Sequence, residues 1–525
     1  MVKQPVSIFN DVIGPVMRGP SSSHVAAAVR IGQLVSQLAN GNVKAITVDF
    51  NPTGSLATTY HGHGSDMGLL GGILGYAPSD QKLPTSLRDA AAQGINASFN
   101  IVDYPAKHPN TYRMTVSSSE GDIHVTAVSI GGGMIELQEI ENIPVSISGD
   151  FYETLVFFND INHCQLETYR KEATTHIPQY SHCDYAISDS AGLLDIKTEY
   201  ELSETLIIRL QDMADVRKVI QLAPVLPIKS RKDCSVPFHT AEQMLNIESK
   251  ENLQLWELAL SYESERGSIS TEAVFKKMKD IVLIMKKSIE GGLEGTSYGD
   301  RILGPQACMI ERAGGEGRLV PGDVLNTVIA AITAMMEVKS SMGVIVAAPT
   351  AGACGVVSGS ILGTAREMGL DIEDVTKGML AAGIIGVFIA EHATFAAEVC
   401  GCQAECGSGS AMAAAGLVQL AGGTAEQCVD AAAMALQNML GLVCDPVANR
   451  VEVPCLGRNV MGGSNALASA NMALAGFDKV IPLDETIDAM FNVGKLLPTE
   501  LRCTGCGGLS MTETSQAIEK AMEVS

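Results

Sequence analysis

The chain has 525 residues, which is too long for one ordinary domain and predicts roughly two to four. Hydrophobic residues make up 46% and charged residues 18%, a composition that supports a large core and excludes a disordered chain. The net charge of −23 argues against a nucleic-acid-binding protein, because neutralising phosphates requires an excess of Lys and Arg.

The first residues lack a basic segment followed by an apolar run, so we expect no secretory signal and a cytoplasmic protein. The longest uncharged stretch, residues 340–365, contains Pro349 and many glycines, and it predicts a buried core segment and no membrane span. We expect an acidic, apolar chain of this kind to form a homodimer or another homo-oligomer.

The N-terminal part mixes strand and helix patterns. Residues 43–50 and 96–102 alternate as strands, and residues 111–130 predict a hairpin that turns at Glu120-Gly121-Asp122. Residues 23–40 and 65–76 have helical periodicity. Together they predict an α+β domain over residues 1–148.

The middle of the chain has shorter patterned segments and more charged residues. Strand composition occurs at 153–158, 204–210 and 225–230, with a helical pattern at 213–222. This content predicts a small regulatory α/β module over residues 149–232. A Lys- and Glu-rich region at 239–290 predicts exposed helices, which gives a helical connector over residues 233–289.

From residue 290 onward strand-type alternation is nearly absent. Four segments rich in Ala, Met and Leu predict helices, at 327–338, 376–393, 410–423 and 428–443. Residues 290–525 therefore predict an all-helical domain. The expected fold class is a multidomain protein with an N-terminal α+β domain, a small α/β module and a C-terminal all-α domain.

Thirteen cysteines in a chain without an expected export signal predict reduced thiols. Nine of them lie in the last 172 residues, a clustering that favours a metal or cluster site. Three thiolates brought together could hold an iron–sulfur cluster and leave one iron open as a Lewis acid. The alternative is that these cysteines are small buried hydrophobes, and the spacing alone does not decide, because no zinc-type or ferredoxin-type CxxC pair is present.

Several motifs resemble the iron–sulfur-dependent L-serine dehydratases, in the order in which single-chain members fuse their β and α portions. The resemblance covers most of the chain. The β-type motifs are GPSSSH (19–24), GSLATTYHGHGSD (54–66), HPNTYRM (108–114) and SIGGG (129–133). The α-type motifs are AAPTAGACG (347–355), GCQAECG (401–407), LVCDPV (442–447), VEVPCLGRN (451–459) and ELRCTGCGGLS (500–510).

The resemblance implies a lyase that eliminates water from L-serine to give pyruvate and ammonia. It implies a [4Fe-4S] cluster on Cys402, Cys444 and Cys455, in the C-terminal catalytic domain, and an ACT-like character for the middle module. Five further cysteines are expected to belong to the core or to stand behind the ligands: Cys354, Cys400, Cys406, Cys503 and Cys506.

Removal of the weakly acidic α-proton requires a positioned base. His63 matches the family's Gly-His and is the first candidate, His61 is the second, and the alternative for either is an ordinary loop histidine. A carboxylate cradle is expected where hydroxyls and free N–H groups precede a helix, although an ordinary serine N-cap has the same pattern. Its residues are Ser21, Ser22, Ser23 and His24.

Further candidates are expected around the substrate and the cluster. Asn110 and Thr111 either contact the substrate or only form a turn after Pro109. Thr350 and Gly352 are expected to line the site, and Arg458 and Asn459 to orient the cluster or the substrate, because they follow an expected ligand.

The chain departs from the family pattern at three places. Val25 and Ala27-Ala28 replace the Thr and Gly-Pro of SSSHTxGP, and Lys339 begins a Lys-Ser-Ser-Met-Gly segment where relatives often have Asn-Ala-Ser-Met-Gly. Cys503 and Cys506 stand in a motif that often carries Glu-Thr-Ala. These changes leave other hypotheses open: an L-cysteine desulfidase, a lyase for another β-substituted amino acid, or an inactive cluster-binding regulator. A pyridoxal-phosphate dehydratase lacks a convincing lysine motif, and a zinc-binding interaction protein is the remaining alternative.

Overall fold

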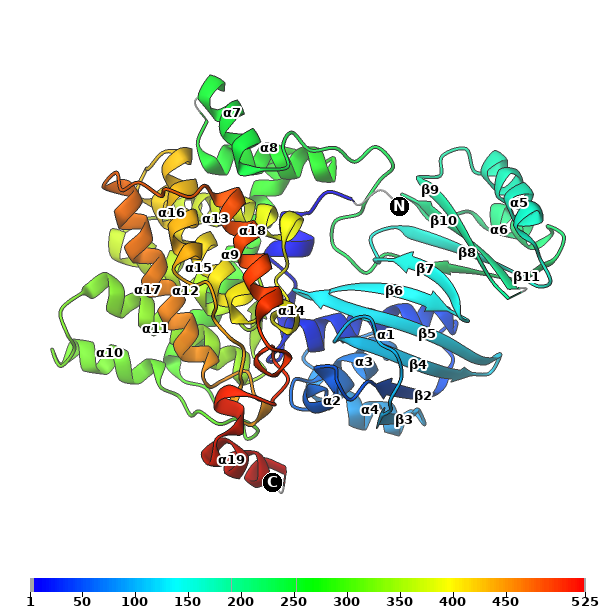
Figure 1. Cartoon of the computed structure of the whole chain (residues 1–525), viewed down its shortest axis with the longest axis horizontal. Coiled ribbons are helices and arrows are strands. Elements are labelled where there is room, and N and C mark those ends of the chain that lie inside the picture. Colours follow the sequence, from blue (N-terminus) through cyan, green and yellow to red (C-terminus); the bar gives the residue numbers. More distant parts are fainter. Residues whose placement is uncertain (1–3, 190, 252, 524–525) are drawn as a thin grey trace.

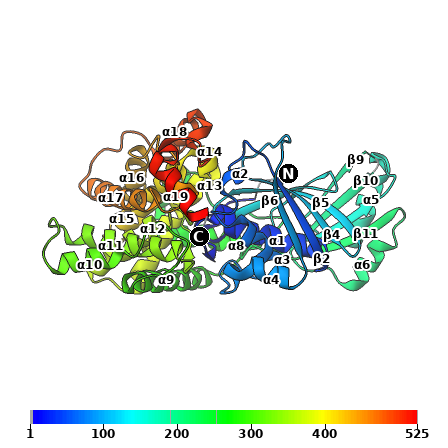
Figure 2. The same ribbon diagram turned by 90° about the horizontal axis from the view of Figure 1, so that it is seen from below.

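The computed structural model describes residues 4–189, 191–251 and 253–523. The N-terminal sheets and the C-terminal helices form two halves that lie side by side (Figures 1 and 2). This arrangement confirms the predicted multidomain layout. Within the described ranges, no helix is long and apolar enough to cross a membrane.

The N-terminal half is built on a six-stranded sheet of order β3-β2-β4-β5-β6-β7, in which only the β2–β3 pair is parallel. The β4–β5 hairpin pairs Ser118 with Gly121, so its turn consists of Ser119 and Glu120 and lies one residue earlier than predicted. The strands are β2 (Val43–Phe50), β3 (Asn96–Ile101), β4 (Thr111–Ser118), β5 (Gly121–Gly131), β6 (Met134–Ile140) and β7 (Ile143–Ile147).

Helices α1 (Ala27–Leu38) and α3 (Ser65–Ile73) pack against this sheet in one apolar core, with the short α2 (Leu56–Thr59) and α4 (Ser86–Ala92) beside them. The two main helices approach each other through glycines. A Cβ atom on Gly72 would lie 2.0 Å from the carbonyl oxygen of Val29, and one on Gly32 would lie 2.2 Å from that of Leu69. This close contact brings together the segments that precede the two helices.

The middle module has the order β8, α5, β9, β10, α6, β11, and its antiparallel sheet has the order β11-β8-β10-β9. This is the split βαββαβ arrangement of ferredoxin-like folds. The elements are β8 (Tyr152–Phe158), α5 (His163–His176), β9 (His182–Ser188), β10 (Ala191–Thr198), α6 (Glu204–Gln211) and β11 (Val216–Leu222).

Three predicted elements of this module are wrong. Residues 204–210 form helix α6 instead of a strand, residues 216–222 form strand β11 instead of a helix, and residues 225–230 lie in no strand. Periodicity cannot separate a helix from a strand in such short apolar segments. Pairing with β8 fixes Val216–Leu222 as a strand, because it satisfies the backbone hydrogen-bonding groups of a segment rich in β-branched residues.

One face of the module's sheet is packed against the N-terminal half. Leu155, Phe157 and Leu193 belong to the same core as the six-stranded sheet, whereas the alternate residues Val156 and Leu194 belong to the module's own core. The module therefore shares a hydrophobic interface with the domain that precedes it.

A buried ion cluster lies at this interface. The Nζ atom of Lys197 is 2.6 Å from Glu153 Oε2 and 3.0 Å from Asp195 Oδ2, and it donates to the carbonyl of Ser146 on β7. Because Lys197 binds both units, its charge helps to fix the module in place.

The C-terminal half is helical apart from β12 (Val344–Val346), which pairs with β1 (Val16–Arg18) of the N-terminal half. Helix α15 is buried along its whole length and forms the centre of the bundle. The helices are α7 (Ala241–Glu251), α8 (Leu255–Gly267), α9 (Thr271–Glu294), α10 (Ala307–Gly315), α11 (Asp323–Ser340), α12 (Cys354–Met368), α13 (Ile372–His392), α14 (Ala397–Cys400), α15 (Ser408–Leu420), α16 (Ala425–Gln437), α17 (Cys455–Leu474), α18 (Leu483–Leu496) and α19 (Glu513–Glu523).

Two details of this half differ from the predictions. Helix α16 ends at Gln437, six residues before the predicted end, and the chain then turns through Gly441, which has a φ of +84°. The charged region 239–290 is helical, but α8 and α9 are not simply exposed. Each has a buried apolar face in the main helical core, and most of the charges lie on the opposite face, although Glu263 and Arg266 of α8 are buried.

Candidate active site at the junction of the two halves

A cavity lies between the N-terminal half and the helical half. Six residues predicted from the sequence line it, two serines, one histidine, one glycine and two cysteines, together with residues that were not predicted to line the site. The lining consists of Ser21, Ser23, His63, Gly352, Ala397, Glu398, Glu405, Cys444, Pro446, Val451, Cys455 and Cys503.

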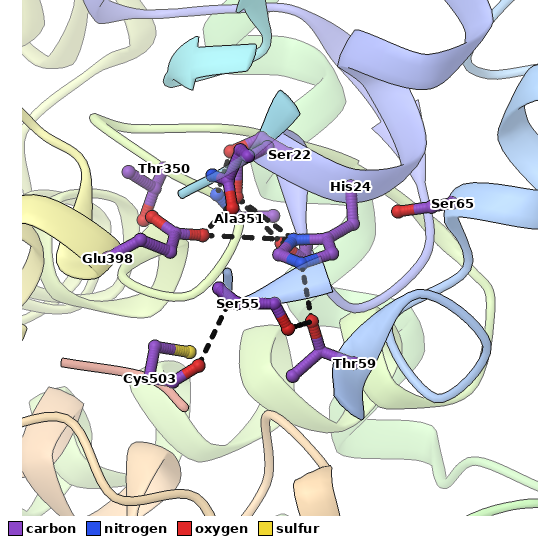
Figure 3. A network of polar contacts seen from close by, with 12 residues as sticks. Ser22, His24, Ser55, Thr59, Ser65, Thr350, Ala351, Glu398 and Cys503 are labelled. Carbon is purple, nitrogen blue, oxygen red and sulfur yellow. Dashed lines mark hydrogen bonds and ion pairs between the residues drawn. The ribbon is translucent and has the colours of Figure 1, made fainter. Parts of the chain in front are cut away.

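The serine segment forms the first turn before α1 and is bonded to the helical half. Residues Ser22–Ala26 are in a π-helical turn that continues directly into α1. The Oγ of Ser22 accepts from the N–H of Ala351 (Figure 3). The Oγ of Ser23 donates to Glu398 Oε1 at 2.9 Å. The predicted cradle is therefore held by both halves of the molecule.

His24 stands directly behind this segment and has no exposed surface. Its Nε2 is 2.9 Å from Thr59 Oγ1, and the Thr59 hydroxyl donates to the carbonyl of Ser55. Since that hydroxyl proton is already used, Nε2 carries the imidazole proton, and Nδ1 is the acceptor, 2.9 Å from Ser21 Oγ. Burial lowers the pKa of His24 to about 4, so the ring is neutral at physiological pH.

The same network reaches the C-terminal segment. The Oγ of Ser55 donates to the carbonyl oxygen of Cys503 at 2.9 Å (Figure 3). Ser55, Thr59 and His24 thus form a continuous chain of hydrogen bonds from the serine segment to the cysteine region.

The two candidate bases lie in different environments. His63 lines the cavity, both of its ring nitrogens are buried without a partner, and its ring centroid is 4.6 Å from that of His24. Burial lowers the pKa of His63 well below its usual value, which leaves a neutral imidazole able to accept a proton. The His61 side chain is 73% exposed, and its Nδ1 is 2.6 Å from Asp66 Oδ2, a hydrogen bond that raises its pKa. His61 lines a separate depression with Arg450.

The three cysteines expected as ligands are all buried in the same region. Two of them are paired with a second thiol. A hydrogen bond between Cys402 and Cys406 lowers the pKa of Cys402, and one between Cys444 and Cys503 raises the pKa of Cys444. Burial raises the pKa of Cys455 above its ordinary range.

Of the five further cysteines, Cys406 and Cys503 stand next to the expected ligands. Cys354 is buried in α12 near Met336, and Cys400 is buried in α14 against α18. Cys506 is exposed, so the prediction that it belongs to the core or stands behind the ligands is wrong. Over the residues described here, no three His, Cys, Asp or Glu side chains converge closely enough to hold a single metal ion.

Arg458 and Asn459 stand behind the cysteines, outside the cavity lining. Arg458 Nη2 is 2.7 Å from Asp445 Oδ1. The hydrogen bond with Cys406 is the main cause of the lowered pKa of Cys402. The Arg458 guanidinium lowers this pKa further, whereas burial raises it. The side-chain amide of Asn459 donates to the carbonyls of Gly352 and Cys455 at 2.8 Å each. Asn459 therefore fixes the start of α17 against the cavity loop.

The remaining predicted residues contact the site less directly. Thr350 Oγ1 donates to Glu405 Oε1 at 2.7 Å. Asn110 is fully buried and both polar atoms of its side chain lack a partner, whereas Thr111 Oγ1 donates to the carbonyl of His108 within its own turn. Neither Asn110 nor Thr111 belongs to the cavity lining.

Two of the departures from the family motifs, Val25 and Lys339, lie outside the cavity lining, whereas Cys503, which belongs to the third departure, lines the cavity. Val25 is buried and fills the space beside Gly19 and Gly64, where an added Cβ would come within 3.0 Å of its side chain. Lys339 is fully buried, and its Nζ donates to the carbonyl of Val451, a residue that does line the cavity.

Two glutamates on the cavity wall were not predicted. Glu398 comes from α14, and Glu405 comes from the π-helical turn Gln403–Gly407 after the first expected ligand. Burial raises the pKa of Glu405 to about 8, so this carboxyl group is protonated at neutral pH. Glu405 lies inside the GCQAECG motif and was therefore accessible from the sequence, whereas Glu398 has no sequence pattern that distinguishes it from a surface glutamate.

Comparison with known families gives two matches. The model of the serine dehydratase beta chain matches residues 9–103, and the model of the serine dehydratase alpha chain matches residues 250–510. The cavity is lined by residues from both matched regions.

Individual relatives have the same two parts. The chain is 39% identical over 283 residues to a probable L-serine dehydratase alpha chain of Bacillus subtilis, covering 54% of this chain and 94% of the relative. It is 42% identical over 154 residues to a probable beta chain of the same organism, covering 29% of this chain and 69% of the relative. An L-serine dehydratase of Haemophilus influenzae is 26% identical over 503 residues, covering 94% of this chain and 96% of the relative.

Proposed function

Since the chain belongs to the serine dehydratase family and carries its beta and alpha parts in one polypeptide, we propose that it is an L-serine ammonia-lyase that releases pyruvate and ammonia. The observation that carries the proposal is the shared cavity. An unpartnered neutral histidine, His63, lines the same cavity as Cys444 and Cys455 at the junction of the two parts.

Cys402, Cys444 and Cys455 would hold a [4Fe-4S] cluster. Their donor chemistry fits such a group, because all three are buried thiols and the Arg458 guanidinium favours the thiolate form of Cys402. When bound, the cluster supplies a Lewis-acidic iron with an open coordination position for a hydroxyl group.

The chain's own residues would perform the remaining tasks. The first N–H groups of the turn that begins at Ser22 would bind the substrate carboxylate, because N–H groups at the start of a helical turn have no intrahelical acceptor. A ring nitrogen of His63 would accept the α-proton. The buried wall would exclude water from the reacting atoms until the enamine product leaves and hydrolyses.

The first experiment is pyruvate release from L-serine before and after anaerobic iron–sulfur reconstitution. We expect activity to appear with the cluster and to fade in air. Turnover of L-cysteine with little turnover of L-serine would instead support the desulfidase, and a reconstituted cluster without turnover on any β-substituted amino acid would support the regulator. Zinc without sulfide, or an absorbance band of a pyridoxal-phosphate Schiff base, would overturn the proposal.

Ligand variants test the cluster assignment. Cys402→Ala, Cys444→Ala and Cys455→Ala should each lose bound iron and activity, whereas Cys428→Ala, which changes a buried cysteine of α16 outside the cavity, should retain both. Full iron retention in any of the first three would exclude that residue as a ligand.

A separate variant tests the base. His63→Asn should retain iron but lower kcat by roughly 10²- to 10⁴-fold, the usual contribution of a general base. His61→Asn serves as the matched control, since its ring lies outside the cavity, and it should lose little activity. An undiminished rate in His63→Asn would exclude it as the base. A homo-oligomer in the cytoplasm remains part of the proposal, and sedimentation measures the oligomeric state.

A further inference from the structure

Glu398 places a carboxylate on the wall of the cavity where the two halves meet. Its side chain is only 4% exposed, and it comes from α14, four residues before Cys402. The carboxylate faces the serine segment and His24 (Figure 3). One of its oxygens, Oε1, accepts from the hydroxyl of Ser23 at 2.9 Å.

The charge of this carboxylate is poorly compensated by the protein. Among the residues that the structure describes, its only ion-pair contact is with His24, at 3.8 Å from Nδ1. The hydrogen bonds of His24 make Nδ1 an acceptor, so this ring offers no proton to Glu398. A buried carboxylate with one hydroxyl partner and no Lys or Arg in ion-pair distance is costly unless a cation binds beside it.

The substrate class under the proposed function supplies such a cation. An α-amino acid carries its carboxylate and its ammonium on the same carbon, so a site that binds the carboxylate at Ser21–Ser23 brings the ammonium within a few ångströms of the same segment. Glu398 is hydrogen-bonded to that segment through Ser23. The other glutamate of the wall, Glu405, already accepts from Thr350 on the side of Gly352.

We propose that the Glu398 carboxylate binds the α-ammonium group of the substrate and thereby selects amino acids over acids that lack the amine. This inference rests on the proposed function. In this arrangement the hydroxyl of Ser23 also orients Glu398, to which it is hydrogen-bonded. His24 orients Ser21 through its Nδ1.

The experiment compares two ligands that differ only in the amine, L-serine and 3-hydroxypropanoate. Binding of both is measured by anaerobic titration calorimetry on the reconstituted full chain, wild type and Glu398→Gln, together with KM and kcat for L-serine. We expect Glu398→Gln to weaken the binding of L-serine roughly 10- to 100-fold, the usual contribution of a hydrogen bond to a charged group. The affinity for 3-hydroxypropanoate should be unchanged or higher.

Two further variants keep the result interpretable. Glu263→Gln removes another buried carboxylate, one that binds Ser7 and Ile8 outside the cavity, and it should not change the ratio of the two affinities. Glu398→Asp keeps the charge on a shorter side chain and should lower the selectivity less than Glu398→Gln. If Glu398→Gln does not fold, a Glu398→Asp variant with unchanged selectivity for L-serine would overturn the inference.

The two levels of the proposal fail in different ways. Wild-type protein that neither binds L-serine nor releases pyruvate would overturn the proposed function, and the inference with it. If the wild type is active and Glu398→Gln weakens the binding of both ligands equally, only the inference is overturned. Glu398 would then be a structural residue.

Discussion

The contact between α1 and α3 makes a sharp prediction, because it sets the distance between two parts of the site. The serine segment precedes α1, and His63 precedes α3 by two residues. In Gly72→Ala the new Cβ would lie 2.0 Å from the carbonyl oxygen of Val29 and within 3.0 Å of two further backbone atoms. All three neighbours are backbone, so no side chain can rotate away, and the helices must separate by about 1 Å to restore an ordinary contact.

The magnitude follows from this overlap. Overpacking of a buried contact costs about 1–3 kcal/mol, and the helix preference of Ala over Gly returns at most about 1 kcal/mol. We therefore expect Gly72→Ala to be destabilised by roughly 1–2 kcal/mol. A displacement of about 1 Å between the serine segment and His63 should lower kcat/KM by up to roughly 10²-fold.

The matched control is Gly291→Ala in α9, where no atom lies within 4 Å of the added Cβ and φ is not positive. This exposed helical position should gain up to about 1 kcal/mol with unchanged activity. Thermal unfolding and pyruvate release from L-serine measure both effects. If Gly72→Ala melts no lower than wild type and keeps full activity, the spacing of α1 and α3 does not control the site as argued.

Other predictions concern buried charge. Lys197→Met should lower the free energy of unfolding by about 3–5 kcal/mol, because it leaves Glu153 and Asp195 without their cation. Lys279→Met, which breaks a half-exposed ion pair with Glu373, should lower it by less than about 1 kcal/mol. Chemical denaturation compares the two variants, and equal losses of stability would contradict the role of the interface cluster. The pKa of His24 is lowered by burial to about 4, so between pH 6.5 and pH 4 the unfolded chain binds the extra proton. Stability should fall as pH decreases through this window, by up to about 3 kcal/mol from this residue, and His24→Asn should have a shallower dependence in unfolding curves at several pH values. A slope that is identical in the variant would show that His24 is not the group responsible.

The sequence by itself determined most of the local structure. Long periodic segments such as 376–393 and 410–423 became helices α13 and α15, and the alternating segment 43–50 became strand β2, because periodicity over many residues specifies both the element and its buried face. The motifs also identified cysteines and a histidine that the structure brings to one cavity.

The tertiary structure decided what local patterns leave ambiguous. Residues 204–222 exchanged helix and strand relative to the prediction, because pairing with β8 outweighs the preference of a short segment. His61 and His63 are two residues apart in one motif, yet only His63 lines the cavity, whereas the His61 side chain is mostly exposed. Glu398 and Cys503 joined the site from segments far from the serine motif, and their contacts with Ser23 and Ser55 exist only where the two halves pack. Convergence of distant side chains is a property of packing, which no local sequence pattern specifies.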